Sequence, residues 1–383
     1  MIDLPGMAQI WTVLPEARMV GGAVRDMLAG QVLADVDFAV PLPPAEVMAR
    51  AKRAGLKFIP TGLAHGTVTL LAGGRAFEVT SLRRDVETDG RHARVVFTDD
   101  WVADAARRDF TINAMSCDEG GQVFDYFGGQ VDLAAGIVRF VGDAAQRIAE
   151  DYLRILRFFR FFARYGRGEP DAAAIAAIAG ARDGLSGLSP ERVWQELKKI
   201  LQASAPCAAI MLMRQTGVLE MVLPGSSPER LAALLARSAP ADPLLRLAAL
   251  TAADCSERLR LSNAESELLA QWRAPFDLTP GADDAALRQA LAEIPGSVLT
   301  GQSWLYGGDD EDWASLRMRL AMMSPPVFPL QGRDLLAFGI EAGPDMGRIL
   351  ALVRRWWWQG GCVADKASCL RWAAAIVKPP AAS

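Results

Sequence analysis

Two aspartates separated by a single residue, Asp35 and Asp37, are the first candidates for chemistry in this sequence. Alternate residues of a β-strand point to the same face, so we expect the two carboxylates to lie together. Carboxylates that close repel each other unless a cation lies between them. Mg²⁺ is typically held by one or two carboxylates together with substrate phosphates. Taken alone, a pair of this kind is more often a solvated strand edge.

A glycine pair and an arginine precede these aspartates, in the stretch Val20-Gly-Gly-Ala-Val-Arg-Asp26. Because Gly21 and Gly22 have no side chains, their backbone N–H groups can approach an anion at the start of the next helix. Arg25, on the first turn of that helix, is placed to pair with a phosphate. A glycine pair alone is usually only a turn, but strand, glycines, helix and DxD in this order predict a site for a metal–triphosphate complex.

A second candidate is the run Ala106-Arg-Arg-Asp-Phe-Thr-Ile-Asn-Ala-Met115. Arg108 can hold a phosphate, and Asp109 can accept a hydrogen bond from a ribose hydroxyl. Without further context, such residues more often form a solvated helix cap.

A third candidate is an acid followed by arginines at helical spacing: Asp151, Arg154, Arg157 and Arg160. Residues three apart lie along one stripe of a helix. Asp151 can accept from an exocyclic amine and Arg154 can donate to a ring nitrogen or carbonyl, a pairing that suits cytosine and adenine and rejects uracil and guanine. The alternative is an ordinary salt bridge within the helix.

The elements that must position these residues differ along the chain. Up to about residue 140, strand and helix patterns alternate, with a strand over 35–40, a helix over 45–53 and a hairpin formed by 66–71 and 75–80. Beyond residue 142 the patterns are helical, beginning with one long helix over 143–165 and continuing with 172–181 and a helix capped by Ser189 and Pro190. The fold class is therefore α+β, a mixed-sheet head followed by all-α segments.

Composition excludes several classes of protein. The net charge is −4, so the chain is not a generally basic nucleic-acid binder, although a local basic patch is allowed. Five widely spaced cysteines and two histidines argue against a disulfide framework, a zinc site and a His-rich phosphohydrolase site. No apolar run reaches the ~18 residues of a membrane span, and no targeting leader is evident. We therefore expect a cytoplasmic protein without a membrane association.

Together, these motifs resemble the class II tRNA nucleotidyltransferase and bacterial poly(A) polymerase family, within the polymerase-β-like superfamily. The resemblance covers residues 18–200 in the family's order and includes a hinge-like stretch from Asp125 to Arg139 and a bracing helix from Leu188 to Glu196. It implies four parts: a nucleotidyltransferase head (1–140), a helical neck (141–205), a body (206–300) and a tRNA-binding tail (301–383).

The resemblance also implies an activity, the Mg²⁺-dependent addition of CCA to the 3′ end of tRNA from CTP and ATP. Asp35 and Asp37 would be catalytic and hold the metal, and Glu78 on a later strand is a hypothetical third carboxylate. The nucleotide-binding residues would be Gly22, Arg25, Arg108, Asp109, Asp151, Arg154, Arg157 and Arg160. The stretch Arg83 to His92 resembles the flexible loop of members that add the terminal A. No obligate protein partner is implied.

Two other functions stay open at this point, a poly(A) or A-adding polymerase and a non-catalytic RNA-binding module. Basic residues of the neck and tail are candidate RNA contacts: Arg164, Arg167, Lys198, Lys199, Arg354, Arg355 and Arg371. The tryptophans at 356–358 either stack on RNA or, more often for such a cluster, form a helix core.

Overall fold

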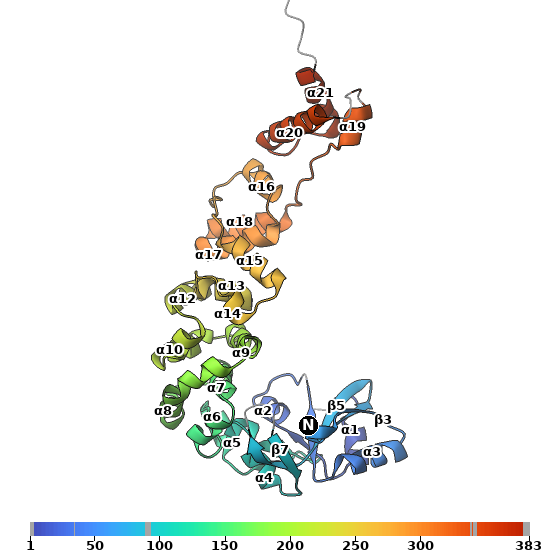
Figure 1. Ribbon diagram of the computed structural model, residues 1–383, viewed down its shortest axis with the longest axis vertical. Helices are drawn as coiled ribbons and strands as arrows, with labels where there is room; N and C mark the ends of the chain where they lie inside the picture. The colour runs from blue at the N-terminus through green and yellow to red at the C-terminus, as the bar shows by residue number, and fades with distance from the viewer. Residues whose placement is uncertain (1–3, 34, 89–92, 338, 340–342, 378–383) are drawn as a thin grey trace, which may run out of the picture. The chain divides into compact units, whose positions relative to one another are not determined.

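The computed structural model describes residues 4–33, 35–88, 93–337, 339 and 343–377 (Figure 1). The chain divides into two compact units, the first comprising residues 1–226 with 258–260 and the second comprising 227–257 with 261–383. The finer division into head, neck, body and tail stays a prediction.

A seven-stranded mixed sheet forms the head, in the order β3-β4-β5-β2-β1-β8-β9. Its strands are β1 (Arg18–Val20), β2 (Asp37–Val40), β3 (Lys57–Gly62), β4 (Thr67–Ala72), β5 (Arg75–Ser81), β8 (Met115–Cys117) and β9 (Val123–Asp125). A separate two-stranded ribbon consists of β6 (Arg83–Thr88) and β7 (Ala93–Phe97). The predicted mixed-sheet head is confirmed, and so is the β4–β5 hairpin. The loop prediction for Arg83 to His92 falls partly on residues 89–92, which lie outside the described residues.

Strand β2 pairs with β5 in parallel and with β1 in antiparallel orientation. The predicted start of this strand at Asp35 was wrong, because the ladder begins at Asp37. The alternation of exposed Asp35, buried Val36 and exposed Asp37 nevertheless continues ahead of the strand, so both aspartates lie on one face. On the other face Phe38 is fully buried and makes edge contacts with the rings of Trp11 and Phe77.

Helices cover this sheet and continue beyond it in the first unit. They are α1 (Met7–Val13), α2 (Gly22–Leu28), α3 (Pro44–Arg53), η1 (Leu63–His65), α4 (Trp101–Ala106), η2 (Thr111–Asn113), α5 (Gly129–Ala135), α6 (Ala144–Glu150), α7 (Leu153–Tyr165), α8 (Ala172–Ala181), η3 (Arg182–Gly187), α9 (Pro190–Gln202), α10 (Pro206–Gln215) and α11 (Val218–Val222). Helices α3, α8 and α9 match the sequence prediction closely.

The prediction of a single long helix over residues 143–165 was wrong, because the helix is interrupted between α6 and α7. Asp151 has extended backbone angles, φ −158° and ψ 107°, and its side chain accepts a hydrogen bond from the backbone N–H of Leu153. Aspartate competes for nearby backbone donors in this way, which ends one helix and starts the next. Helix α7 is held to the head by aromatic contacts of Phe158 and Phe161 with Phe110.

The helices from residue 227 onward are α12 (Pro228–Ala236), α13 (Pro243–Leu250), α14 (Ser256–Leu259), α15 (Asn263–Arg273), α16 (Asp284–Leu291), α17 (Gly296–Tyr306), α18 (Glu311–Met322), α19 (Gly332–Ala337), α20 (Pro344–Gln359) and α21 (Lys366–Val377). In α20, Trp357 is buried and Trp356 stacks on Trp372 of α21 with ring centroids 5.3 Å apart. The tryptophan run is therefore helix core, the alternative that the sequence favoured. All five cysteines are free thiols. No described helix is both long and apolar enough to traverse a bilayer.

Candidate active site

The glycine pair makes a left-handed turn between β1 and α2. Gly21 has φ +63°, a conformation that residues with a Cβ rarely adopt. A Cβ at Gly21 would also stand only 3.3 Å from Nη1 of Arg108. The backbone angle favours glycine here, and a Cβ would push the end of the Arg108 side chain aside by a few tenths of an ångström. The turn thus brings the backbone next to an arginine that can bind phosphate.

The catalytic candidates lie at the edge of this turn. Asp37 pairs with Val20 on β1 and with Glu78 on β5, so the carboxylates of Asp37 and Glu78 are neighbours on one face of the sheet. Removal of water by the surrounding protein raises the pKa of the Asp37 carboxyl, and the charge of Glu78 raises it further. Arg108 opposes this rise in pKa, whereas Asp35 adds to it. The structure thus brings Asp35, Asp37 and Glu78 into one electrostatic cluster.

This cluster has the donor chemistry of a hard divalent cation. Burial raises the pKa of Asp37 most, and the neighbouring charges of Glu78 and Asp35 raise it further, so a cation bound among these oxygens would relieve their mutual repulsion. Within the described parts of the chain, no three His, Cys, Asp or Glu side chains already form a complete metal-binding group. Mg²⁺ suits such a partial set, because it usually takes one or two carboxylates and completes its shell with water and substrate phosphates.

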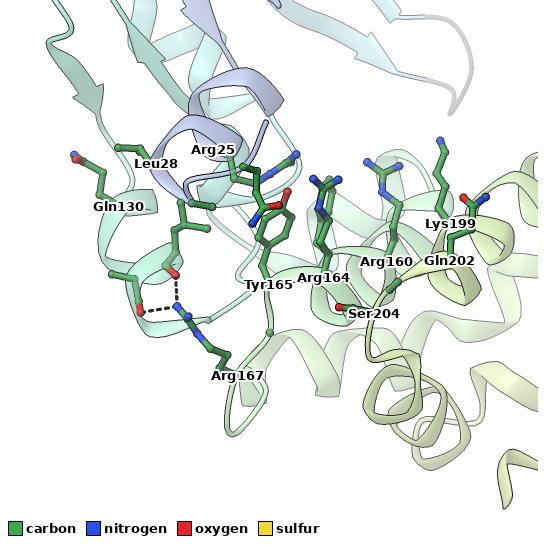
Figure 2. A pocket seen from close by; sticks show the side chains of 17 residues that line it. Arg25, Leu28, Gln130, Arg160, Arg164, Tyr165, Arg167, Lys199, Gln202 and Ser204 are labelled. Carbon is green, nitrogen blue, oxygen red and sulfur yellow. Dashed lines mark hydrogen bonds between the residues drawn. The ribbon is translucent and has the colours of Figure 1, made fainter. Parts of the chain in front are cut away.

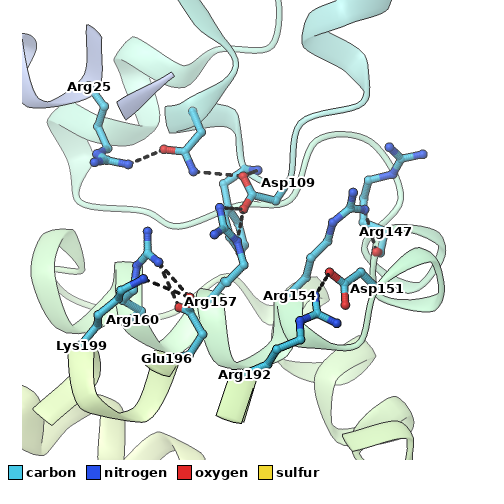
Figure 3. Close-up of polar contacts among 12 residues, drawn as sticks. Arg25, Asp109, Arg147, Asp151, Arg154, Arg157, Arg160, Arg192, Glu196 and Lys199 are labelled. Atoms are coloured by element: carbon cyan, nitrogen blue, oxygen red, sulfur yellow. Dashed lines mark hydrogen bonds and ion pairs between the residues drawn. The ribbon is translucent and has the colours of Figure 1, made fainter. Parts of the chain in front are cut away.

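A chain of hydrogen bonds runs from Arg25 of α2 to Arg157 of α7 (Figure 3). Arg25 is buried and its Nη1 donates to Oδ1 of Asn113 at 2.5 Å. The amide nitrogen of Asn113 donates in turn to Oδ1 of Asp109 at 3.0 Å. Oδ2 of Asp109 accepts from Nε of Arg157 on α7 at 2.7 Å. Two of the predicted phosphate and ribose residues, Arg25 and Asp109, are therefore linked through an amide that the sequence analysis assigned no role.

Asp109 is the charged centre of this chain. Burial alone would raise the pKa of its carboxyl, but the charge of Arg157 and the hydrogen bonds from Asn113, Arg157 and the Phe110 backbone outweigh burial and lower the pKa. The side chain is thus held as a carboxylate that can accept a hydrogen bond from a sugar hydroxyl.

The predicted base-reading pair is arranged differently from the expected stripe. In the described structure the backbone N–H of Arg154 donates to the Asp151 carbonyl at 3.0 Å, but no ion pair joins the two side chains, which sets aside the simple intrahelical salt bridge between them. Instead Oδ2 of Asp151 accepts from Arg192 of α9 at 2.8 Å, and Nη1 of Arg154 donates to Glu150 at 2.5 Å and to the Arg147 carbonyl at 2.8 Å. These bonds orient both side chains without using all of their hydrogen-bonding groups. The Asp151 carboxylate has about four lone pairs and the Arg154 guanidinium has five N–H donors, so both can still bind a ligand.

Arg160, further along α7, is also braced by helix α9. Nη1 of Arg160 donates to both carboxylate oxygens of Glu196, at 3.1 and 3.0 Å, and Glu196 is buried. Helix α9 therefore bonds to α7 through Glu196 and to the break ahead of α7 through Arg192.

These groups line one cavity of about 430 Å³. In Figure 3, Asp151, Arg154 and Arg192 lie toward one side, Asp109 and Arg157 lie between, and Arg25 lies on the other side. Gly21, Gly22 and Arg108 also line the cavity. Every predicted nucleotide-binding residue lines it: Gly22, Arg25, Arg108, Asp109, Asp151, Arg154, Arg157 and Arg160. Asp35 and Asp37 are not in that lining; the charge interaction of Asp37 with Arg108 places them beside it.

Sequence reasoning gave no site role to the lining residues Asn113, Leu153 and Phe161, placed Arg107 in a motif without selecting it, and gave Arg192 only a bracing role. Asn113 lies four residues after Asp109 in the same quoted run, and this spacing was the available signal for it. Arg192 lies 41 residues from Asp151, so only the packing of α9 against α7 reveals that the two bond.

Paired carboxylates on a mixed sheet, a glycine turn and an arginine-lined cavity define a nucleotidyltransferase. Comparisons with known proteins agree. The family described as poly A polymerase head domain matches residues 17–139, and the one described as "Probable RNA and SrmB- binding site of polymerase A" matches residues 169–230. Zebrafish (Danio rerio) CCA tRNA nucleotidyltransferase 1, mitochondrial, is 37% identical over 381 residues, covering 92% of this chain and 86% of the relative.

A bacterial relative and a solved structure extend the comparison. The CCA-adding enzyme of Levilactobacillus brevis is 31% identical, covering 88% of this chain and 87% of the relative. The crystal structure of the Bacillus stearothermophilus CCA-adding enzyme in complex with CTP superimposes with a TM-score of 0.75 at 26% identity, covering 96% of both chains. The chain belongs to the family of CCA-adding tRNA nucleotidyltransferases, and it is an enzyme of that class.

Proposed function

We propose that this chain adds CCA to the 3′ end of tRNA, with CTP and ATP as substrates and Mg²⁺ as cofactor. The observation that carries the proposal is the order of groups in the 430 Å³ cavity. The cavity has a base-reading end, then a buried carboxylate that suits ribose, then an arginine-rich end that suits phosphates. This is also the order of base, ribose and phosphates in a nucleoside triphosphate. The names of the zebrafish and bacterial relatives, and the CTP bound to the Bacillus enzyme, support this assignment.

Asp35 and Asp37 would hold Mg²⁺, and Glu78 is a third candidate because it is the register partner of Asp37. When bound, Mg²⁺ supplies neutralisation of the triphosphate charge and a lower pKa for the attacking hydroxyl. Gly22, Arg25 and Arg108 bind the phosphates, while Asp109 accepts from the ribose and Arg157 keeps that carboxylate charged.

The nucleotide transfer is a single nucleophilic substitution at the α-phosphorus. The 3′-hydroxyl oxygen of the RNA forms a bond to the α-phosphorus. The bond from that phosphorus to the oxygen bridging to the β-phosphate breaks, and pyrophosphate leaves with the electron pair. The hydroxyl proton goes to solvent or to a nearby carboxylate, for which Glu78 is the candidate.

Asp151 and Arg154 select the base. Asp151 accepts from the exocyclic amine of cytosine or adenine, and Arg154 donates to a ring nitrogen or carbonyl. Uracil and guanine place a carbonyl against the carboxylate, and an unpaired buried acceptor is costly. The brace from Arg192 keeps Asp151 oriented for this selection.

The RNA partner would be held largely by basic residues outside the cavity. Arg354 and Arg355 on α20 and Arg371 on α21 are exposed and are candidates for contacts with phosphates. Cytoplasmic localisation and the lack of an obligate protein partner stay predictions from the sequence.

The proposal is tested with purified protein, Mg²⁺ and a tRNA transcript lacking its last three nucleotides. CTP alone should add two residues, ATP alone should add none, and both together should add three. A long ladder with ATP alone would identify a poly(A) polymerase instead. A single addition confined to tRNA that already ends in CC would identify an A-adding enzyme.

A further inference from the structure

A second and larger cavity, of about 1010 Å³, lies beside the nucleotide cavity (Figure 2). Helices α2, α5, α7 and α9 of the first unit contribute its walls. The two cavities share three lining residues, Arg25, Arg160 and Phe161. They therefore adjoin at the end of the nucleotide cavity that we assign to the phosphates.

The second cavity is strongly basic. Among the described residues that line it there is no carboxylate, and the cations are Arg25, Arg160, Arg164, Arg167 and Lys199. In Figure 2 the charged groups of Arg160, Arg164 and Lys199 stand in a row and point the same way. Two carboxylates behind this row, Asp26 and Glu196, neutralise part of the charge through ion pairs. The remaining excess of positive charge suits a compact anion with several negative charges.

Helix α7 connects the two cavities with a continuous row of arginines. Arg154, Arg157, Arg160 and Arg164 are three or four residues apart, so they share one face of the helix. At 1.5 Å per residue the row spans roughly 15 Å. Arg154 belongs to the base-reading end, Arg157 bonds to the ribose carboxylate Asp109, and Arg164 lines only the second cavity. A nucleotide laid along this row points its phosphates toward the second cavity.

The direction of the reaction agrees with this arrangement. In phosphoryl transfer the attacking and leaving oxygens lie roughly in line on opposite sides of phosphorus. The Asp37 carboxylate interacts with Arg108. The second cavity is lined by Arg25 and Arg160 but by neither Asp35 nor Asp37. An RNA end held in the second cavity would therefore be away from the groups that activate it, but a leaving group would be directed into it.

We propose that the second cavity binds the inorganic pyrophosphate released by nucleotide transfer, with Arg164 and Lys199 as its contacts, before pyrophosphate reaches solvent. This inference rests on the proposed function, because it assumes that a nucleoside triphosphate is cleaved between its α- and β-phosphates. It differs from the hypothesis drawn from sequence, in which Arg164, Arg167 and Lys199 contact RNA.

The test compares the full chain with the double variant Arg164→Gln plus Lys199→Gln. Both side chains are about half exposed, at 52% and 49%, so their replacement should leave the fold intact. A matched control is Lys52→Gln plus Arg53→Gln, which removes two exposed cations from α3, outside the lining of both cavities. Calorimetry would measure the affinities for inorganic pyrophosphate and for CTP, and filter binding would measure the affinity for tRNA.

The double variant should bind pyrophosphate about tenfold more weakly, since each lost charge-assisted hydrogen bond to phosphate weakens binding severalfold. Its affinities for CTP and tRNA should change less than about twofold. Unchanged pyrophosphate binding, an equal loss for CTP and pyrophosphate, or a loss for tRNA alone would each overturn the proposal. These binding measurements test the pyrophosphate site independently of the extension assay. A lack of CCA addition in the extension assay would overturn the proposed function instead.

Discussion

Arg157 of helix α7 and Asp109 of the head form an ion pair in which Nε lies 2.7 Å from Oδ2. Asp109 is buried, and its other oxygen accepts from Asn113, which in turn accepts from Arg25. This one pair joins helix α7, which carries the proposed base-reading residue Arg154, to the part of the head that carries the proposed phosphate-binding turn. The two ends of the nucleotide cavity are therefore held at a defined separation.

Replacing Asp109 with Asn should destabilise the protein by about 2–3 kcal/mol at pH 7, because a hydrogen-bonded charge pair is lost and Arg157 keeps its charge. The pKa of Asp109 is lowered by folding. Its contribution is therefore complete above the unfolded value of about 3.9 and is lost as the pH falls through the lower native value. Urea unfolding of both proteins between pH 7 and pH 3 would show this difference shrinking with acid. A difference independent of pH would contradict the assignment.

The same variant should lose selectivity for ribose. If the Asp109 carboxylate accepts from a sugar hydroxyl, the preference for CTP over 2′-deoxy-CTP should fall about tenfold in kcat/KM, the value of one charge-assisted hydrogen bond. A preference that stays at the wild-type level would mean that the carboxylate serves the Arg157 pair alone.

Arg192 should control fidelity without touching the base, since it acts through Asp151. The variant Arg192→Ala frees Asp151 from its 2.8 Å brace, and incorporation of UTP or GTP relative to CTP should rise. We expect an increase of about tenfold, with Arg192→Lys intermediate because lysine replaces the fork with a single point charge. The control is Arg260→Ala, which removes an exposed ion pair to the neighbouring Glu191. Equal loss of fidelity in the control would argue against a specific role for Arg192.

Gly21 and Gly30 provide a matched pair for the glycine turn. Both have positive φ, +63° and +67°, but a Cβ at Gly21 would stand 3.3 Å from Arg108, whereas a Cβ at Gly30 would meet open space. Each alanine variant should lose about 1–2 kcal/mol of stability from the left-handed backbone. Only Gly21→Ala should also lower kcat/KM, because it displaces a phosphate-binding arginine. Steady-state kinetics and thermal unfolding separate the two effects, and equal kinetics in both variants would rule out the close approach as a functional constraint.

Arg354 and Arg355 are exposed on α20, while the neighbouring Trp357 is buried in the core of the same segment. The double variant Arg354→Gln plus Arg355→Gln should weaken tRNA binding and reduce the slope of log affinity against log salt by about 1–2, according to the number of phosphates released. Filter binding at several salt concentrations measures both quantities, with Lys52→Gln plus Arg53→Gln as the control. An unchanged affinity and slope would remove these arginines from the RNA surface.

Local motifs were the part of this protein that could be predicted from sequence. The strand, glycine turn and helix around Gly21 depend on neighbouring residues, and so does the hairpin joined by Gly73 and Gly74. The residue types within each motif could be recognised from local spacing, whereas their meeting in one cavity depends on how the segments pack.

Long-range pairing could not be predicted in the same way. The register of Asp37 with Glu78 depends on which strands become neighbours in the sheet. The break at Asp151 was missed because helical periodicity continues across it, while a single side chain hydrogen bond to Leu153 decides the backbone. The bonds of Arg192 to Asp151 and of Glu196 to Arg160 likewise require the packing of two helices, which residue spacing does not encode.

The most direct test of the proposed CCA addition uses tRNA lacking CCA with all four nucleoside triphosphates and Mg²⁺ supplied together. The products are then sequenced. The wild-type chain should add C, C and A in that order and then stop. The double variant Asp35→Ala plus Asp37→Ala should add nothing while keeping the far-UV circular dichroism of the folded protein. Incorporation of U or G, continued addition of A, or extension by the double variant would contradict the account.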